Sequence, residues 1–207
     1  MRSSIAALAA LLSSVISVPA SAINLEQRSA AGQSILWVTG EFLQQDGSKF
    51  KRAVQQAGRI DEVWFSSPGG NVMAALEIGR FLRKSGLATR VPKGASCASA
   101  CTYAFIGGVF RAVDPTARVG VHNSTVSGND ELIAKVTRMI RENGAAGAYA
   151  VVNIVERVAA SIAAEQSRYL MEMTVSSELM RPITDTFSVD MHWLTPAELR
   201  RYNVVNE

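Results

Sequence analysis

Cysteine, histidine and charged residues are all scarce in this chain. Its 207 residues include two cysteines and two histidines, and only 19% of them are charged. Two cysteines and two distant histidines give no recognisable zinc spacing, so we expect no metal site. Lysine and arginine are scattered and the net charge is only +3, which argues against nucleic-acid binding. Since 48% of the residues are hydrophobic, a disordered chain is also excluded.

Long apolar runs are lacking too, and the one notable run lies at the N-terminus. Arg2 precedes an apolar stretch, and Ala20, Ser21 and Ala22 then form a small-x-small cleavage site. The stretch has about 14 residues, fewer than the roughly 20 of a spanning helix, which favours a signal peptide over a membrane anchor. We predict a signal peptide at residues 1–22, cleaved after Ala22, and one domain at residues 23–207. No other segment is expected to span a bilayer, so a bacterial protein of this kind would be periplasmic or secreted.

Strands and helices alternate along the first half of the mature chain. Runs of β-branched and apolar residues predict strands at residues 34–40, 62–66, 88–91, 111–113 and 119–122. Helical spacing predicts helices at residues 48–57 and 71–85 and from Ser99 to Gly107, followed by a long helical region at residues 130–180. Residues 189–194 return as a strand or a turn, and a short helix follows Thr195. The pattern indicates an α/β fold with a mainly parallel sheet.

Residues that suit catalysis follow three of the predicted strands. Open α/β sheets bind ligands at the carboxyl ends of their strands, so these residues would meet at one edge. Gly69 and Gly70 end a Ser-Pro-Gly-Gly loop whose N–H groups suit a developing oxyanion. Ser99 stands among small residues at a helix start, as a nucleophile or as a helix cap, and Ser96 is the other candidate cap. His122 ends a strand and is a candidate general base.

These residues resemble the Clp protease proteolytic subunit family. The order and approximate spacing of its motifs cover residues 35–123 and 190–205, and exported ClpP-like proteins of bacteria are the nearest type. The matching residues are Ser67, Pro68, Gly69, Gly70, Ala98, Ser99, Ala100, Gly107, Gly108, Arg111, Pro115, Arg118, His122, Trp193, Leu194, Thr195, Pro196, Ala197, Glu198, Leu199, Tyr202 and Val204.

The resemblance implies a ClpP/crotonase-like fold, a spiral of repeated β-β-α units with a helical handle at about residues 130–180. It also implies a serine peptidase in which Ser99 is the nucleophile and His122 the general base. The backbone N–H groups of Gly70 and Ala100 would then form the oxyanion hole.

The acid of a catalytic triad is less well placed in this sequence. The family has an aspartate two residues before the aromatic that matches Trp193, and here that position is Met191. Asp190 is one residue away, and a local bulge could bring it to His122, so we expect Asp190 as the acid. Asp185 is the second candidate, and a Ser99–His122 dyad is a further alternative. Another clan on this fold pairs serine with lysine, for which Lys135 is the candidate here.

Cys97 and Cys101 flank Ser99 in the sequence. An oxidising compartment permits a disulfide between them, and positions i and i+4 of a helix lie within the range for a bridge, although with strain. The alternative is that both are small buried hydrophobic residues.

We therefore expect an exported, ATP-independent serine endopeptidase that cleaves peptides or unfolded proteins without a cofactor. The family tends to form rings, so we expect a homo-oligomer, with alanine-rich residues 145–164 packing between subunits. A cytosolic ATPase partner is not expected outside the cytoplasm. A catalytically inactive binding or scaffold protein is the alternative, and a crotonase-type acyl-CoA enzyme is the third hypothesis.

Overall fold

The computed structural model describes residues 22–30, 32–125 and 130–207 of the chain. The predicted signal peptide therefore lies outside the described residues, except for Ala22. In the described part, one eight-stranded sheet has the order β1-β2-β3-β5-β7-β8, with β4 paired to β3 and β6. Its strands are β1 (Asn24–Ala30), β2 (Gln33–Phe42), β3 (Glu62–Gly70), β4 (Ala88–Val91), β5 (Ser96–Ala98), β6 (Arg111–Val113), β7 (Arg118–Val121) and β8 (His192–Trp193).

The middle of this sheet is parallel and forks at β3. The first half of β3 pairs with β4, which pairs with β6, and the end of β3 pairs with β5, which pairs with β7. The edge strands β1 and β8 are antiparallel to β2 and β7. Each repeat therefore supplies two short strands and one helix, which is the β-β-α spiral that the sequence motifs predicted. The mainly parallel α/β architecture is confirmed.

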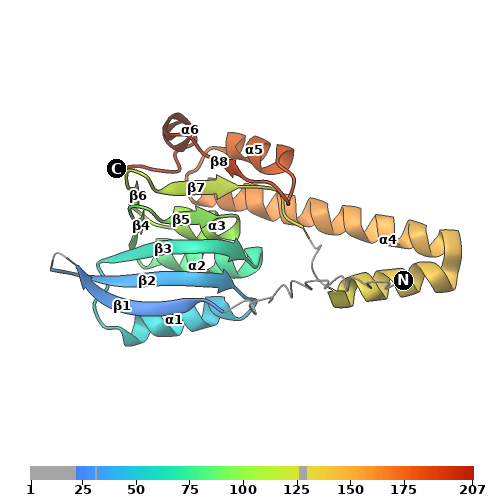
Figure 1. Ribbon diagram of the computed structural model, residues 1–207, viewed down its shortest axis with the longest axis horizontal. Helices are drawn as coiled ribbons and strands as arrows, with labels where there is room; N and C mark the ends of the chain where they lie inside the picture. Colours follow the sequence, from blue (N-terminus) through green and yellow to red (C-terminus); the bar gives the residue numbers. More distant parts are fainter. Residues whose placement is uncertain (1–21, 31, 126–129) are drawn as a thin grey trace, which may run out of the picture.

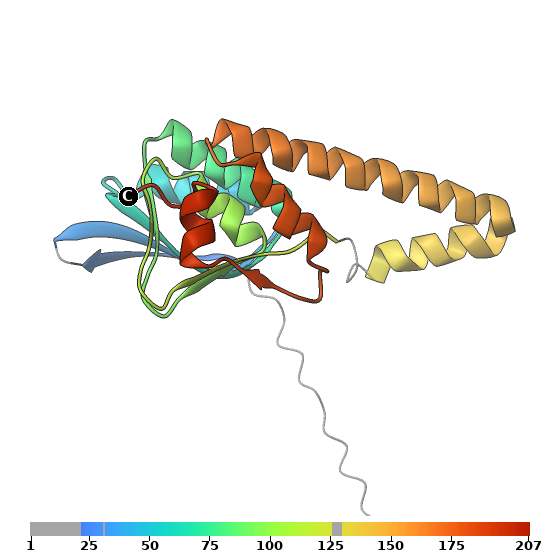
Figure 2. The same ribbon diagram turned by 90° about the horizontal axis from the view of Figure 1, so that it is seen from above.

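Helices cover one side of the sheet, as Figures 1 and 2 show. They are α1 (Asp46–Gln56), α2 (Val72–Lys84) and α3 (Ala100–Ile106). Phe65 of β3, Ile78 of α2 and Phe105 of α3 are fully buried in the core that they share with the sheet. Burial of such side chains contributes about 1.5–3 kcal/mol each relative to exposure. This packing fixes the position of α3, and therefore of the Ser99 turn that precedes it.

The predicted handle is the helix α4 (Asp130–Glu172), which projects from the body (Figure 1). Its backbone kinks at Gly144, where φ is 55°, and the chain folds back toward the sheet. Among the described residues, α4 is the one helix long and apolar enough to cross a membrane, with a mean hydropathy of 1.3 over 18 residues. We expected no segment after the N-terminal apolar run to be long and apolar enough to span a bilayer, and by length and composition this expectation was wrong. The many alanines and valines of α4 keep its mean hydropathy high despite the charges of Glu156 and Arg157.

The root of α4 is fixed to the body by charged and aromatic contacts. Arg80 of α2 forms ion pairs with Glu172 and Glu165. The hydrogen bonds that its guanidinium donates to these carboxylates, first of all to Glu172, raise its pKa. The hydroxyl of Tyr169 donates to the carbonyl of Tyr103 over 2.6 Å. After α4 the chain forms a 3-10 turn (Ser177–Leu179), α5 (Met180–Asp185), β8 and α6 (Pro196–Arg201).

Candidate active site

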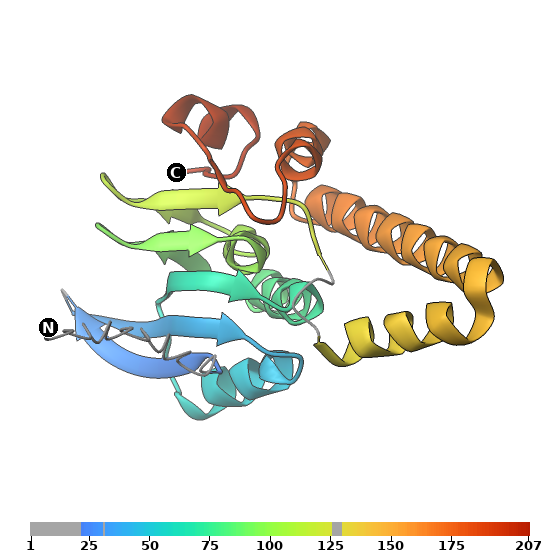
Figure 3. The ribbon, with the colours of Figure 1, turned by 45° about the vertical axis from the view of Figure 1, so that its right-hand side comes forward.

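The strands β3, β5 and β7 end at the same edge of the sheet, as their arrows show in Figure 3. Their register is direct, since Ser67 pairs with Cys97, and Ala98 pairs with Gly120. Ser99 follows β5 and His122 follows β7. The structure therefore brings the glycine loop, the serine and the histidine to the carboxyl ends of neighbouring parallel strands, where such sheets bind ligands.

Ser99 forms a tight turn between β5 and α3. Its backbone has φ 56° and ψ −126°, a conformation that costs of order 1–3 kcal/mol in a residue with a Cβ. Although Ser99 stands at the N-cap position, its side chain caps no N–H of the helix, and it is partly exposed. The hydroxyl is therefore left at the positive end of the helix dipole, where a developing alkoxide is stabilised. The reading of Ser99 as a mere helix cap does not fit this geometry.

Two contacts fix this turn to the strand that leads to His122. The Ser99 N–H donates to the carbonyl of Gly120 over 2.9 Å, and the buried hydroxyl of Thr102 donates to the same carbonyl over 2.9 Å. His122 follows Gly120 by two residues, about 6.6 Å along an extended strand. Sequence reasoning missed Thr102, whose only signal was a small polar residue in the first turn of an otherwise apolar helix.

Cys97 and Cys101 form a disulfide across the turn. Their Cα atoms are 5.2 Å apart, and both residues are fully buried. The strained i,i+4 helical geometry that the sequence suggested was wrong, because Cys97 lies in β5 and only Cys101 lies in α3. The bridge thus closes a five-residue loop with Ser99 at its centre.

The two glycines of the loop face opposite sides. A Cβ on Gly69 would lie 2.7 Å from the Ser99 Cβ and 2.8 Å from the Ala100 nitrogen, so only glycine allows β3 to approach the serine turn. A Cβ on Gly70 would instead meet the carbonyl of Phe42 in β2 at 2.4 Å. The Asn71 N–H donates to that same carbonyl.

His122 is oriented by a backbone carbonyl. Its Nδ1 lies 2.8 Å from the carbonyl oxygen of Asn123, and the Asn123 N–H donates to Thr186 O over 2.9 Å. A carbonyl only accepts, so this hydrogen bond requires the proton on Nδ1 and leaves the lone pair on Nε2. That tautomer is the one a general base uses against a hydroxyl. Nothing in the sequence marks the carbonyl of Asn123 for this role.

The candidate acids lie elsewhere. The β7–β8 register is regular where Gly120 pairs with Trp193 and Val121 with His192, so no bulge shifts the chain there. Continued by one residue, it places Met191 opposite His122, and a Cβ on Gly120 would meet the Met191 sulfur at 2.7 Å. Asp190 is exposed and its N–H donates to Phe187 O. Among the described residues, no hydrogen bond or ion pair joins Asp190 to His122.

Asp185 and Lys135 are engaged in other contacts. Asp185 lies 3.6 Å from Arg181 at the surface of α5, and Lys135 lies 2.6 Å from Glu131 on α4. Both pairs are exposed. Ser99, His122, Gly70 and Ala100 therefore lie at the same edge of the sheet, at the ends of β3, β5 and β7 and at the start of α3. Within the described part of the chain, no hydrogen bond or ion pair joins Asp190 or Asp185 to His122, and none joins Lys135 to Ser99.

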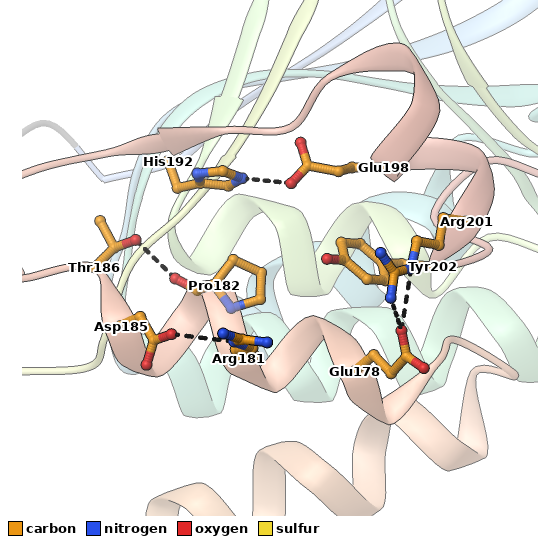
Figure 4. A pocket seen from close by; sticks show the side chains of 9 residues that line it. All are labelled: Glu178, Arg181, Pro182, Asp185, Thr186, His192, Glu198, Arg201 and Tyr202. Atoms are coloured by element: carbon orange, nitrogen blue, oxygen red, sulfur yellow. Dashed lines mark hydrogen bonds and ion pairs between the residues drawn. The ribbon is translucent and has the colours of Figure 1, made fainter.

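A cavity of about 530 Å³ lies between α5, β8 and α6 (Figure 4). Its charged side chains already pair with one another, His192 with Glu198 at 2.9 Å and Arg201 with Glu178 at 2.8 Å. Hydrogen bonds, chiefly from the Thr195 N–H, lower the pKa of Glu198. Ser99 and His122 do not line this cavity. The described residues also contain no group of three histidine, cysteine or acidic side chains that could hold a metal ion.

Comparisons with known proteins show the fold. No protein family model matches the chain, and no curated protein does. Among solved structures, a mutant ClpP1 from Listeria monocytogenes is 20% identical with a TM-score of 0.51, over 84% of this chain and 89% of that one. A mutant 1510-N membrane-bound stomatin-specific protease is 17% identical with a TM-score of 0.46, over 82% and 75%. The first of these likenesses shows that the chain has a ClpP-like α/β fold, as its sequence motifs predicted.

Proposed function

We propose that this chain is an exported serine peptidase that uses Ser99 and His122. The observation that carries the proposal is the Ser99 turn. Its serine has a positive φ and a hydroxyl with no hydrogen-bond partner among the described residues, and its N–H is bonded to Gly120 of β7, the strand that His122 follows. Backbone strain of this kind persists where surrounding contacts impose it, and it concentrates at active sites. Here the contacts are the disulfide, the Thr102 hydroxyl and the close approach of Gly69.

The mechanism is acyl transfer through a covalent intermediate. His122 Nε2 takes the proton from the Ser99 hydroxyl as the serine oxygen attacks the carbonyl carbon of a peptide bond. The resulting oxyanion accepts hydrogen bonds from the N–H groups of Gly70 and Ala100, the latter at the start of α3. His122 then gives the proton to the leaving amine. Water hydrolyses the acyl-enzyme by the reverse sequence, so no cofactor is consumed.

In this proposal the carbonyl of Asn123 does part of the work of a triad carboxylate. It holds the Nδ1–H tautomer of His122 and orients the ring. A neutral carbonyl stabilises the imidazolium less than a carboxylate would, so the acyl-transfer step is slower than in a complete triad. The site therefore functions as a dyad, and the expected acid Asp190 has no catalytic role.

The substrates are peptides or unfolded proteins, because the peptide bond to be cut must lie in an extended segment that can reach Ser99 and His122 at the ends of their strands. Export removes the protein from cytosolic ATPases, and unfolded or short substrates need none. The related fold and the exposed apolar face of α4 support a homo-oligomer. Ile140, Val152, Val155 and Val158 on that helix are all exposed.

A peptide-cleavage assay tests this function. The mature chain is incubated with a mixture of unstructured peptides, and new termini are detected by mass spectrometry. We expect cleavage by the wild type and by Ser96→Ala, the neighbouring serine on β5, and none by Ser99→Ala. Equal cleavage by Ser99→Ala would contradict the proposal.

The dyad geometry also supports a second candidate, a non-catalytic binding protein. No carboxylate among the described residues bonds to His122, which is the observation that favours it. In that case peptides would bind without being cut, and Ser99→Ala would leave the cellular phenotype intact. Intact recovery of the whole peptide mixture from folded wild-type protein would select this second candidate.

A further inference from the structure

Ile23 and Asp46 are both buried and in contact. Ile23 is fully buried and Asp46 is 3% exposed at the start of α1. The Ile23 backbone N–H donates to Asp46 Oδ2 over 3.3 Å, and the Leu43 N–H donates to the same oxygen over 2.7 Å. Among the ion pairs of the described residues, none includes Asp46. The carboxylate is therefore buried in the first turn of α1, where the helix dipole favours a negative charge, and accepts hydrogen bonds from backbone amides with no side-chain cation paired to it.

The cleavage site predicted from the sequence falls directly before Ile23. Hydrolysis of the Ala22–Ile23 bond by a signal peptidase adds one water, which leaves a carboxylate on Ala22 and an amine on Ile23. An α-amine titrates at a pKa of about 8, so it is protonated at neutral pH. The nitrogen that gains this charge is the one that already lies 3.3 Å from the Asp46 carboxylate.

We infer that the mature N-terminus of this protein is the cation that Asp46 is built to bind. The α-ammonium of Ile23 has three donors in place of one, and forms a buried ion pair with the Asp46 carboxylate. Removal of the signal peptide thereby stabilises the mature fold. The inference rests on the proposed export and on cleavage after Ala22, and it does not depend on the chemistry of Ser99.

Other contacts hold Ile23 where the pair needs it. The Lys49 ammonium, one turn along α1, donates to the Ile23 carbonyl. Asn24 begins β1, whose seven residues pair with β2. Because the Ile23 side chain is inside the core, the peptide bond before it is more accessible to a peptidase before the chain folds than afterwards. Processing during export would cut the bond at that earlier stage.

The ion pair lies close to the proposed oxyanion loop. The Leu43 N–H donates to the Asp46 carboxylate, and Leu43 directly follows Phe42. The Phe42 carbonyl in turn accepts from the N–H of Asn71, the residue after Gly70. The chain at the end of β2 is thus linked to Ile23 through the Asp46 carboxylate and to the residue after β3 through the Phe42 carbonyl. The position of Gly70 depends on the same few residues that the ion pair orders.

Four chains test the pairing in solution. Chains that begin at Ile23 and chains that retain Ser21 and Ala22 are each made with Asp46 and with Asp46→Asn, and their melting temperatures are measured at neutral pH. With Asp46 present, removal of the two extra residues is expected to raise the Tm by roughly 5–10 °C. With Asp46→Asn the gain is expected to fall to about 2 °C or less. Equal gains in both backgrounds, or no gain with Asp46, would overturn the inference.

A chemical variant covers the case in which Asp46→Asn does not fold. Acetylation of the α-amine in the chain that begins at Ile23 keeps Asp46 and turns the ammonium back into an amide, so the charge and two of the three donors are lost. The Tm is expected to fall to that of the extended chain, and an unchanged Tm overturns the inference. The intact mass of exported protein is expected to correspond to residues 23–207, and any other first residue also overturns it. A failure of peptide cleavage with these Tm results intact would count against the proposed function alone.

Discussion

Ser99 and Gly120 are joined by a backbone hydrogen bond of 2.9 Å, from the serine N–H to the glycine carbonyl. This bond fixes the serine turn after β5 to β7, the strand that His122 follows. The same carbonyl accepts from the Thr102 hydroxyl. Gly120 O is therefore the point at which the candidate nucleophile and the candidate base are held in one frame, and changes around it are expected to disturb both.

Loss of the Thr102 hydroxyl is expected to loosen this frame. Thr102 is 1% exposed, so Thr102→Val keeps the volume but removes the donor to Gly120 O. The free energy of unfolding should fall by about 1–2 kcal/mol, because one buried hydrogen bond is lost. Urea denaturation measures the change. Thr102→Ser keeps the hydroxyl and serves as the control, and equal losses in the two variants would contradict the assigned bond.

Asp190 is expected to be dispensable for activity. It is exposed, and in the described structure the Asn123 carbonyl occupies the Nδ1 side of His122. Asp190→Asn should therefore keep kcat/KM for peptide cleavage within about twofold of wild type. Removal of a true triad acid costs about 10⁴ in rate, so a drop of a hundredfold or more would restore Asp190 as the acid.

The disulfide is expected to resist reduction in the folded protein. Both Cys97 and Cys101 are fully buried, so a thiol reductant reaches the bridge only when the chain opens. Alkylation of cysteine after treatment with dithiothreitol should be slow in buffer and complete in urea. Rapid alkylation without urea would mean that the Ser99 turn opens far more often than its contacts imply.

Removal of the Cys97–Cys101 disulfide should lower the free energy of unfolding. A five-residue loop gains about 2 kcal/mol from closure in the chain-entropy account, so Cys97→Ala combined with Cys101→Ala should cost roughly that amount. Urea denaturation measures the loss. The reduced wild type is the matched control, since it loses the bond but keeps both sulfur atoms. A loss below about 0.5 kcal/mol in both proteins would show that the bridge adds no constraint.

Thr195 and Glu198 form a capping box at the start of α6, in which each side chain accepts a hydrogen bond from the other residue's backbone N–H. This pair gives a stability change with a definite sign in acid. Donors from Thr195 and His192 hold the pKa of Glu198 below its ordinary value. Stability from a carboxylate with a lowered pKa is present above its unfolded-state pKa and is lost as the pH falls through the folded-state value. Between about pH 5 and pH 3, wild type should lose up to about 1 kcal/mol more than Glu198→Gln. Equal losses in thermal melts would contradict the assignment.

The sequence predicted the strands that have their own apolar pattern. Residues 34–40 and 62–66 are rich in β-branched and aromatic residues and are bounded by turn residues, so their strands were found. The edge strand β1 (Asn24–Ala30) was missed because its sequence NLEQRSA is polar, and pairing with β2 alone defines it. The three small residues of β5 (Ser96–Ala98) carry no signal either, since β3 and β7 impose the extended conformation.

The candidate site, like the fold, was predictable from the sequence only in part. Ser99, His122, Gly70 and Ala100 stand at motif positions, so their shared sheet edge could be predicted. The orientation of His122 could not, because it depends on a backbone carbonyl that every residue possesses. The expectation for Asp190 relied on a bulge, and the regular β7–β8 pairing at Gly120 and Val121 does not contain one. Side-chain direction at a strand end is set by register, which one sequence does not specify.

Labelling with a fluorophosphonate probe tests most directly whether Ser99 is a nucleophile activated by His122. We expect one adduct on folded wild-type protein, mapped to Ser99 by peptide mass spectrometry, and normal labelling of Ser96→Ala. Ser99→Ala should take up no probe, and His122→Ala should react at least a hundredfold more slowly, as general-base catalysis contributes about 10²–10⁴. The absence of an adduct on folded wild type, or an adduct that persists in Ser99→Ala, would contradict the account.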